Sequence, residues 1–284
     1  MYGRVRGVPF GGRSAGCSGR LVMALILALF AVGAYYFGTQ RVENPITGEV
    51  QRVSLSPQEE IAMGLQAAPE MAQEYGGLYP DEQAQAYLDQ VGQRVVQKSQ
   101  AGQTEYSFDF HLLADTETVN AFALPGGQVF ITAALYSQLE TEGQLAGVLA
   151  HEVGHVVGRH ASERIAKTQL VQGLTGAAVV AAYDPQNPSS AQQAQMAALV
   201  GQLITMKYSR TDELESDRLG VRFMADAGYD PRALIRVMEI LEAAGASRPP
   251  EFFSTHPNPE NRIAEIQAAI EAEFPGGVPA GLTQ

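Results

Sequence analysis

The chain has 284 residues, 45% of them hydrophobic, so it can bury a core as one large domain or two small ones. Its formal net charge of -12, with no basic patch carrying interleaved aromatic residues, argues against a nucleic-acid partner. The single cysteine, Cys17, excludes an intrachain disulfide and a cysteine-rich metal site.

The N-terminal residues predict a basic tail followed by a membrane helix. Residues 1–20 contain four arginines and no acidic residue, and residues 21–38 are almost wholly apolar. As a helix, this apolar stretch is about 27 Å long, close to the thickness of a bilayer core. The positive-inside rule then predicts a single-pass signal anchor in the cytoplasmic (inner) membrane, with a cytoplasmic tail and a periplasmic or extracytoplasmic body. A cleaved signal peptide with an apolar core from Leu21 to Phe30 is the alternative.

The next segment predicts a linker and then two helices. Residues 39–55 are polar and contain turn-forming pairs, which indicates a linker. Ser56 and Pro57, with Glu59 three residues after the serine, carry the N-terminal signature of a helix. A second helix is expected from about Asp81 to Lys98, where apolar residues recur on one side.

Residues 106–131 predict a small β-sheet. The stretch from Tyr106 to Leu113 alternates apolar and polar residues, as a half-buried strand does. Residues 120–131 contain a Pro-Gly-Gly turn and predict two further short strands. Thr141 is then expected to cap a long apolar helix.

This long helix carries the HExxH pattern in His151, Glu152 and His155. Residues four apart lie about 40° from each other around a helix, so both imidazoles can reach one metal ion. Glu152 lies about 100° from His151, so its carboxylate can reach a water molecule on that metal instead of the metal. Two histidines, an open coordination position and a carboxylate base are the layout of a zinc hydrolase. A buried helix that carries two histidines by chance is the alternative.

A catalytic zinc site needs a third protein ligand. His160 lies one position short of the third histidine of the metzincin pattern and is assigned to the end of the helix. Glu213 and Asp217 lie four apart on a predicted helix, so they share a face. One of the two, with Glu213 preferred, can bind zinc while the other accepts the N–H of a ligand histidine. Glu215 is expected to face elsewhere, and a solvated acidic run is the alternative.

The segment after the HExxH helix has two interpretations. Residues 170–182 and 196–206 are apolar, and a turn is predicted at 183–190. The two apolar stretches are either core helices or a hairpin lid over the site that touches the membrane. Further helices are expected after Asp230-Pro231 and from Asn258-Pro259 to about Glu273, followed by a flexible tail at 274–284.

HEVGH at 151–155 and Ser-Arg-x-x-Glu-x-Glu-x-Asp at 209–217 resemble the HtpX-like and CAAX-prenyl-protease-like zinc metallopeptidases, of gluzincin type. The resemblance covers roughly residues 56–272 and includes Asn120-Ala-Phe-Ala-Leu-Pro-Gly-Gly, which is similar to a substrate-edge segment. His256-Pro257 with Arg262 is similar to the His-Pro-x-x-x-x-Arg motif of the family. The single anchor most resembles the BepA-like and Oma1-like branch.

The resemblance implies an α+β, mainly α-helical zincin-like metallopeptidase domain at 56–273 with a small β-sheet, preceded by one transmembrane helix. It implies one Zn²⁺ per chain and nominates His256 as an oxyanion donor that Arg262 helps to place. In the related branch an equivalent histidine instead caps the zinc. A peptide substrate is expected to add as an extended strand along Asn120, Ala121, Phe122 and Ala123.

The predicted function is a membrane-anchored zinc endopeptidase that hydrolyses unfolded or misassembled proteins in protein quality control. Zinc held by His151, His155 and Glu213 activates water, and Glu152 acts as the general base. The competing hypothesis is a membrane-tethered holdase or assembly factor. Its zinc would be structural and closed by four protein ligands, with His256 as the fourth.

Overall fold

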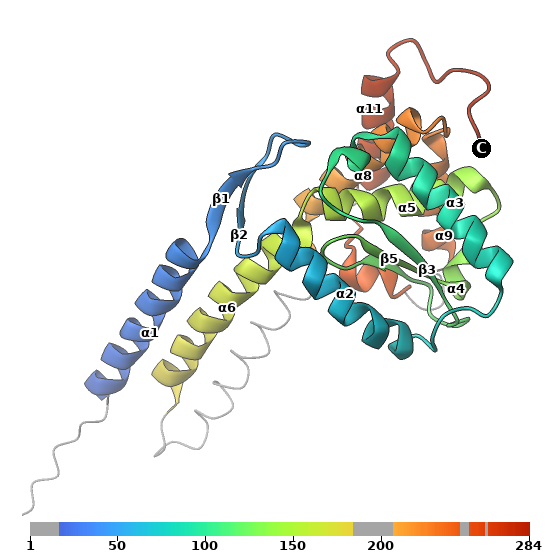
Figure 1. Ribbon diagram of the computed structural model, residues 1–284. Coiled ribbons are helices and arrows are strands. Elements are labelled where there is room, and N and C mark those ends of the chain that lie inside the picture. Colours follow the sequence, from blue (N-terminus) through green and yellow to red (C-terminus); the bar gives the residue numbers. More distant parts are fainter. Residues whose placement is uncertain (1–16, 184–206, 245–249, 259–260) are drawn as a thin grey trace, which may run out of the picture.

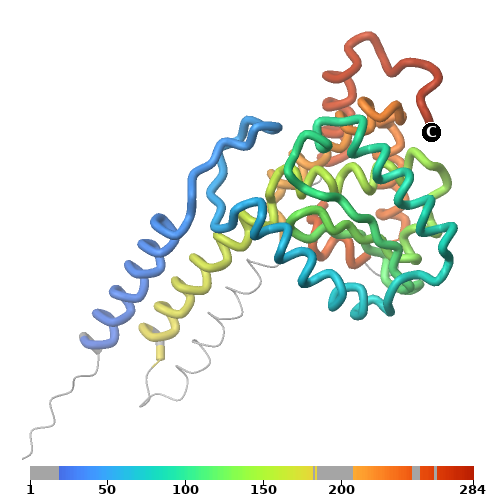
Figure 2. Tube along the Cα trace, in the orientation of Figure 1, coloured from blue at the N-terminus to red at the C-terminus, as the bar shows by residue number. Residues whose placement is uncertain are grey.

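The structure is a computed structural model in which residues 17–183, 207–244, 250–258 and 261–284 are described. A pair of long helices, α1 and α6, extends away from a rounded body in which helices surround a small sheet (Figures 1 and 2). The predicted class, mainly helical with a small β-sheet and a preceding apolar helix, is confirmed. The apolar stretch at 196–206 and the predicted turn beyond Tyr183 lie outside the described residues.

Helix α1 (Cys17–Gly38) covers the predicted anchor, and by length and composition it could cross a membrane. The linker predicted at 39–55 instead contains an antiparallel hairpin of β1 (Gln40–Glu43) and β2 (Val50–Val53). Asn44 shapes its turn by accepting the backbone N–H of Ile46, and it donates to the Val157 carbonyl at 2.7 Å. The hairpin therefore fastens α1 to the end of the HExxH helix.

The two predicted helices that follow are confirmed as α2 (Pro57–Glu74) and α3 (Glu82–Lys98). Ser56 and Glu59 form the expected capping box, and the Asp81 side chain caps α3. Helix α3 continues into a short 3₁₀ turn, η1 (Gln100–Gln103), and packs on the sheet through Gly92. A Cβ on Gly92 would lie 2.5 Å from the Phe110 ring, so only glycine lets the helix approach this closely.

The predicted sheet is confirmed as β3 (Asp109–Leu113), β4 (Ala121–Ala123) and β5 (Gln128–Thr132). Its order is β3-β5-β4, with β3 parallel and β4 antiparallel to the buried central strand β5. Gly126 and Gly127 make the turn with φ of 83° and 112°, values that other residues rarely adopt. This topology leaves β4 as an edge strand beside the HExxH helix α5.

After the short α4 (Ala133–Tyr136), helix α5 (Glu142–Val157) begins at its predicted cap, Thr141. Arg159 then adopts a left-handed conformation (φ 54°), which terminates α5. His160 is therefore the first residue of α6 (His160–Ala182) and not the last residue of α5, as was predicted. Residues 170–182 lie beside α1 and away from the core of the body (Figure 1). The second half of the predicted hairpin lies outside the described residues, so the lid stays a prediction.

The remaining helices are α8 (Arg210–Asp226), α9 (Arg232–Ala244), α10 (Phe252–Thr255) and α11 (Arg262–Glu273). Helix α11 begins later than the predicted Asn258-Pro259 cap. Helices α5 and α8 pack closely in the body, where a Cβ on Gly154 would lie 3.0 Å from the Ser216 carbonyl oxygen.

The last two residues of the predicted flexible tail at 274–284 contact the body, and the flexibility of that segment stays a prediction. Thr283 pairs with Tyr229 in a parallel bridge, and its carbonyl accepts the Asp230 backbone N–H at 2.8 Å. The Gln284 side chain also donates to the Asp230 carboxylate. These contacts attach the end of the chain to the loop before α9.

Candidate metal centre

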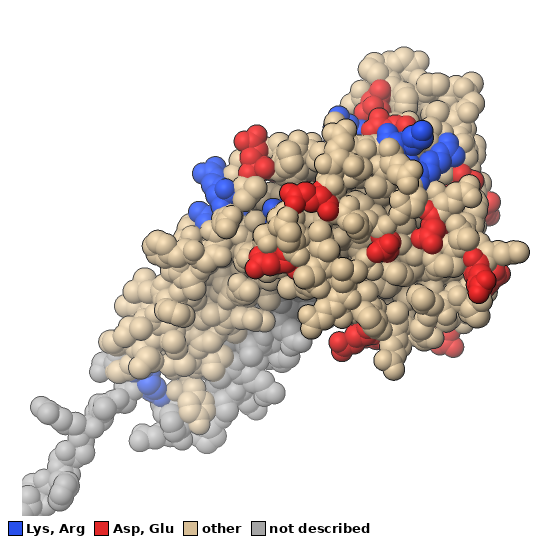
Figure 3. Space-filling model, in the orientation of Figure 1, with Lys and Arg blue, Asp and Glu red and all other residues tan. Residues whose placement is uncertain are grey.

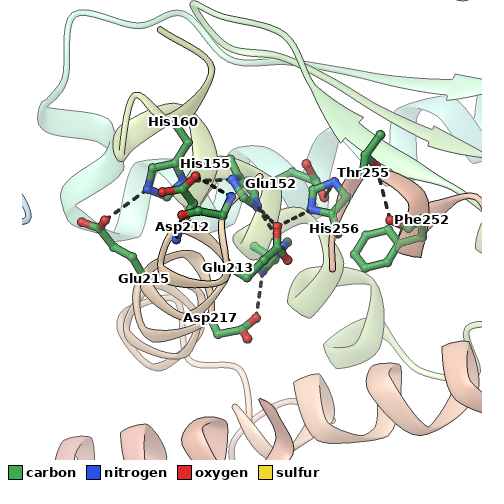
Figure 4. A network of polar contacts seen from close by, with 12 residues as sticks. Glu152, His155, His160, Asp212, Glu213, Glu215, Asp217, Phe252, Thr255 and His256 are labelled. Atoms are coloured by element: carbon green, nitrogen blue, oxygen red, sulfur yellow. Dashed lines mark hydrogen bonds and ion pairs between the residues drawn. The ribbon is translucent and has the colours of Figure 1, made fainter. Parts of the chain in front are cut away.

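Helix α5 carries His151, Glu152 and His155 on a fully buried turn in the middle of the body. Helix α8 supplies Glu213 from its first turn, because Ser209 caps that helix only a few residues earlier. His256 follows α10 and is likewise buried. Figure 4 shows the side chains of these elements pointing toward one another. The i, i+4 spacing of the two helical histidines thus has the predicted effect of bringing both rings to one point.

The distances between the converging atoms fit a single metal ion. The Nε2 atoms of His151 and His155 lie 3.1 Å apart. Glu213 Oε2 lies 3.6 Å from the first of these nitrogens, and Glu213 Oε1 lies 3.4 Å from the second. Tetrahedral zinc with bonds of about 2.0–2.1 Å places its ligand atoms about 3.3 Å from one another. With His256, the four side chains offer one ligand atom each, all within 4.8 Å.

Asp217 and Arg262 fix the orientation of His151. The His151 Nδ1 lies 2.9 Å from Asp217 Oδ1, so its N–H donates to the carboxylate and the Nε2 lone pair is left for a metal. Arg262 donates to both oxygens of Asp217, at 2.7 and 2.9 Å, and pairs with Glu213 Oε2 at 3.1 Å. The resemblance implies that Arg262 helps to place His256, and this role stays a prediction; its guanidinium contacts the two carboxylates, one of which, Glu213, also contacts His256.

His155 is oriented by a second pair, which sequence reasoning missed. His160 Nδ1 lies 2.9 Å from His155 Nδ1, and His160 Nε2 lies 3.2 Å from Glu215 Oε2 (Figure 4). If His155 keeps its Nε2 lone pair for a metal, its Nδ1–H donates to His160, whose Nε2–H donates to Glu215. Glu215 points away from Glu213, as predicted. Its carboxylate instead contacts His160, the residue that orients the candidate ligand His155.

Glu152, the candidate general base, and His256 have buried polar atoms that are available to bind a ligand. Both Glu152 oxygens and His256 Nε2 are buried without a hydrogen-bond partner among the described residues. His256 Nε2 lies 3.8 Å from Glu152 Oε1, and its Nδ1 lies 3.1 Å from Glu213 Oε1. The Phe252 ring stacks on His256 with centroids 4.4 Å apart and fixes its plane. Buried polar atoms of this kind are costly unless something binds them.

Tyr208 covers the other side of the cluster and also escaped sequence reasoning. Its ring stacks on His155 at 4.1 Å, and the Arg164 guanidinium of α6 lies 4.3 Å above it. A small pocket beside these rings is lined by His155, Tyr208 and the residues that follow β4. The edge strand predicted to bind substrate therefore ends next to the candidate metal site.

Burial and pairing shift the pKa values of these groups in opposite directions. Burial raises the pKa of Glu152 above its ordinary value and lowers that of His155 well below it. Burial also opposes ionisation of Glu213, but His256 and the two α5 histidines outweigh it and lower its pKa well below the usual range. Burial lowers the pKa of His151 as well, yet hydrogen bonds to Asp217 and Glu213 raise it to about 9.

Comparison with known proteins assigns this arrangement to one family. The sequence model of peptidase family M48 matches residues 82–270. The beta-barrel assembly-enhancing protease of Escherichia coli (strain K12) is 34% identical over 193 residues, which cover 64% of this chain and 38% of that protein. The mitochondrial metalloendopeptidase OMA1 of Schizosaccharomyces pombe is 33% identical over 244 residues, which cover 84% of this chain and 69% of that protein. The chain thus spans less than half the length of the bacterial relative.

The raised pKa of His151 predicts how the stability of the metal-free protein depends on pH. The protonated ring is stabilised in the folded state, so its contribution is complete below the unfolded value of 6.5 and is lost as pH rises through about 9. We expect chelator-treated protein to lose on the order of 3 kcal/mol of unfolding free energy across this range, measured by urea denaturation.

The matched control is Asp217→Asn, which removes the strongest of the interactions that raise this pKa. The variant should lose less stability between pH 6.5 and 9 than the unsubstituted protein. Equal stability of the metal-free protein at the two pH values would contradict the assignment of a proton to His151.

Proposed function

We propose, because the chain belongs to peptidase family M48, that it is a zinc-dependent endopeptidase held at a membrane. One observation carries this proposal. Two helices bring two imidazoles and a carboxylate to within 3.1–3.6 Å of one another, beside a buried glutamate whose oxygens have no hydrogen-bond partner among the described residues. That combination is the donor set of a hydrolytic zinc site together with its base.

The proposed zinc ligands are His151, His155 and Glu213, the same three residues that the sequence analysis predicts. Zinc bound there supplies Lewis acidity and lowers the pKa of a water molecule toward about 7. The pairs formed by Asp217 with Arg262 and by His160 with Glu215 keep the two imidazoles in the orientation that ligation requires.

Glu152 is the proposed general base. Its buried carboxylate has a raised pKa, which brings it toward the range where it can both accept and return a proton near neutral pH. It accepts a proton as the water oxygen attacks the scissile carbonyl carbon. It then gives that proton to the departing nitrogen as the C–N bond breaks, which completes hydrolysis.

His256 has two possible roles that lead to different behaviour. With its Nδ1–H donating to Glu213, His256 can donate from Nε2 to the oxyanion that forms on the substrate carbonyl when that second ring nitrogen also carries a proton. Alternatively, His256 supplies the fourth ligand of the cluster and closes the site. The second arrangement favours the competing function, a membrane-tethered holdase or assembly factor with structural or latched zinc.

The edge strand β4 is the proposed binding site for substrate. Thr132 donates to the Asn120 carbonyl and Leu124 donates to the Gln128 carbonyl, so the even-numbered residues pair with β5. By the alternation of an antiparallel ladder, the backbone groups of Ala121 and Ala123 point away from the sheet. An extended peptide can add there through main-chain hydrogen bonds, which favours unfolded or misassembled proteins over one defined sequence.

The proposed location follows from α1 and the relatives. Its length and apolar composition suit a membrane anchor, and the arginines before it favour a cytoplasmic N-terminus. The body would then lie on the extracytoplasmic side of the inner membrane. The names of the relatives, a beta-barrel assembly-enhancing protease and a mitochondrial metalloendopeptidase, are in keeping with protein quality control at a membrane.

Glu152→Gln tests the base. The neutral amide cannot accept the proton, so casein cleavage should fall by roughly 10²-fold or more, while zinc content measured by elemental analysis stays at that of the unsubstituted protein. Cleavage that is undiminished in the zinc-loaded variant would refute the role of Glu152.

Glu213→Ala and His160→Ala together test the third ligand. The first should empty the site, because two imidazoles alone hold zinc weakly. The second should leave a full complement of zinc at saturation but weaken its affinity by about 10–100-fold, as the loss of an orienting partner does. Glu239→Ala, which removes an exposed acid on α9, is the control. A site that His160→Ala empties and Glu213→Ala leaves full would contradict the proposed ligand set.

His256→Ala separates the enzyme from the latched or structural alternative. If His256 is an oxyanion donor, chelator-sensitive casein cleavage should fall by roughly 10²–10³-fold at unchanged zinc content. A rise in cleavage would instead identify His256 as a latch. Binding of unfolded casein with no chelator-sensitive cleavage by either protein would select the holdase.

A further inference from the structure

Helix α6 links the candidate metal centre to the apolar helix α1. Its first residue, His160, contacts His155, and its second half lies along α1 (Figures 1 and 2). The two helices run antiparallel, because Arg20 near the start of α1 donates to the carbonyl of Tyr183 just beyond the end of α6, at 2.7 Å. The sequence predicts a single anchor, whereas the structure gives that anchor a partner.

The contact between the two helices is built from small residues. Ala24 and Ala31 of α1 and Ala177 of α6 are buried, and a Cβ on Gly173 would lie 2.5 Å from the Ala31 Cβ. Small side chains let helix backbones approach closely, which is how helices associate within a bilayer. The contact is therefore of a type that works in lipid, where burial of apolar surface gives no driving force.

The end of the helix pair near the body is surrounded by polar and charged groups. Near the body, the Arg52 guanidinium lies 4.6 Å from the Tyr36 ring, and its backbone N–H donates to Glu163 of α6 at 3.2 Å. Lys167, one turn farther along α6, pairs with Glu163 at 2.9 Å. Aromatic and basic side chains of this kind gather where a membrane meets water.

Beyond Lys167, α6 carries no charged residue. Residues 168–183 contain no Asp, Glu, Lys or Arg and as a helix extend about 24 Å, comparable to the apolar part of α1. The polar side chains Gln169 and Gln172 line the groove between the two helices. These polar residues make α6 less apolar than α1, and polar side chains at such a helix–helix groove are found between helices within membranes.

Among the described residues, the exposed side chains of α1 are apolar and those of α6 are mixed. Leu25, Leu29 and Phe30 of α1 are 60%, 62% and 74% exposed, and Leu174 of α6 is 38% exposed, beside the exposed Gln169 and Gln172. On the face drawn in Figure 3, acidic side chains lie on the rounded body, and the visible surface of the helix pair is free of them. An apolar surface of this extent requires an apolar surrounding.

We propose that residues 168–183 of α6 lie in the membrane beside α1, so that the protein is held by a pair of helices and the candidate metal centre sits at the membrane surface. The occupant of the exposed apolar faces is lipid acyl chains. Lys167 lies seven positions after His160, a rise of about 10 Å along α6, so the cluster lies about that far from the polar layer. The proposal rests on the anchoring of α1 proposed above, and it does not depend on peptidase activity.

The absence of tryptophan from the chain gives a direct test. Single variants of the full-length protein, Leu174→Trp on α6, Leu25→Trp on α1 and Leu78→Trp on the body, are reconstituted in phosphatidylcholine vesicles with or without brominated acyl chains. Leu78 is 56% exposed and provides the control in water. We expect blue-shifted emission and at least twofold quenching by brominated lipid for both helix variants, and neither effect for Leu78→Trp.

Three outcomes separate the possibilities. Quenching of Leu25→Trp without quenching of Leu174→Trp, repeated with Leu170→Trp to exclude a local disturbance, would overturn the proposal and leave α1 as a single anchor. Quenching of neither helix variant would overturn both the pair and the anchor. Quenching of both would support the pair whatever the result of the casein assay with Glu152→Gln.

Discussion

The burial of ionisable groups between α5 and α8 is the constraint on which the rest of the structure depends. Glu152, Glu213 and Asp217 are at most 1% exposed, and Arg262 lies among them at 1%. Buried charges are tolerated only when partners compensate them, and removing one partner typically costs about 3–5 kcal/mol. Arg262, the first residue of α11, forms ion pairs with both α8 carboxylates. Helix α11 is therefore required for the site, although it holds none of the proposed ligands.

Close helix packing makes this compensation possible. Gly154 on α5 faces α8 so closely that a Cβ would lie 3.0 Å from the Ser216 carbonyl oxygen, whereas a Cβ on Gly220 of α8 would be in ordinary contact with α5. The glycine inside HEVGH therefore has a packing role: it brings Glu213 and Asp217 within reach of His151. The hairpin and Arg159 then attach the end of α5 to the start of α2 and α6, which ties the site to the helix pair.

The parts of the site that depend on helical spacing could be predicted from the sequence. His151 with His155, and Glu213 with Asp217, are each four apart on one helix, so local geometry fixes their relation. His256 and Arg262 came from resemblance, because no local rule joins them to a helix more than 100 residues earlier. The contact of His160 with His155 could not be foreseen, since it depends on the left-handed conformation of Arg159, which ends α5 and starts α6.

The same limit explains the misassigned segments. Strands β1 and β2 are short and mostly polar, so their pairing depends on the Asn44 turn and on docking to α5. Residues 168–183 contain glutamines and threonines, which obscure the proposed membrane location of α6, because its partner helix lies far away in the sequence. In each case the structure depends on contacts between residues that are distant along the chain, whereas a sequence pattern indicates only contacts between residues that are close along it.

We expect the protein to bind one zinc ion through two imidazoles and a carboxylate, with one coordination position open. X-ray absorption at the zinc edge of the purified full-length protein measures this most directly. We predict nitrogen and oxygen ligands at about 2.0–2.1 Å, two imidazoles, no sulfur, and a spectrum that His256→Ala leaves unchanged. Three imidazoles in the unsubstituted protein that fall to two in His256→Ala would contradict the open site and show a closed one.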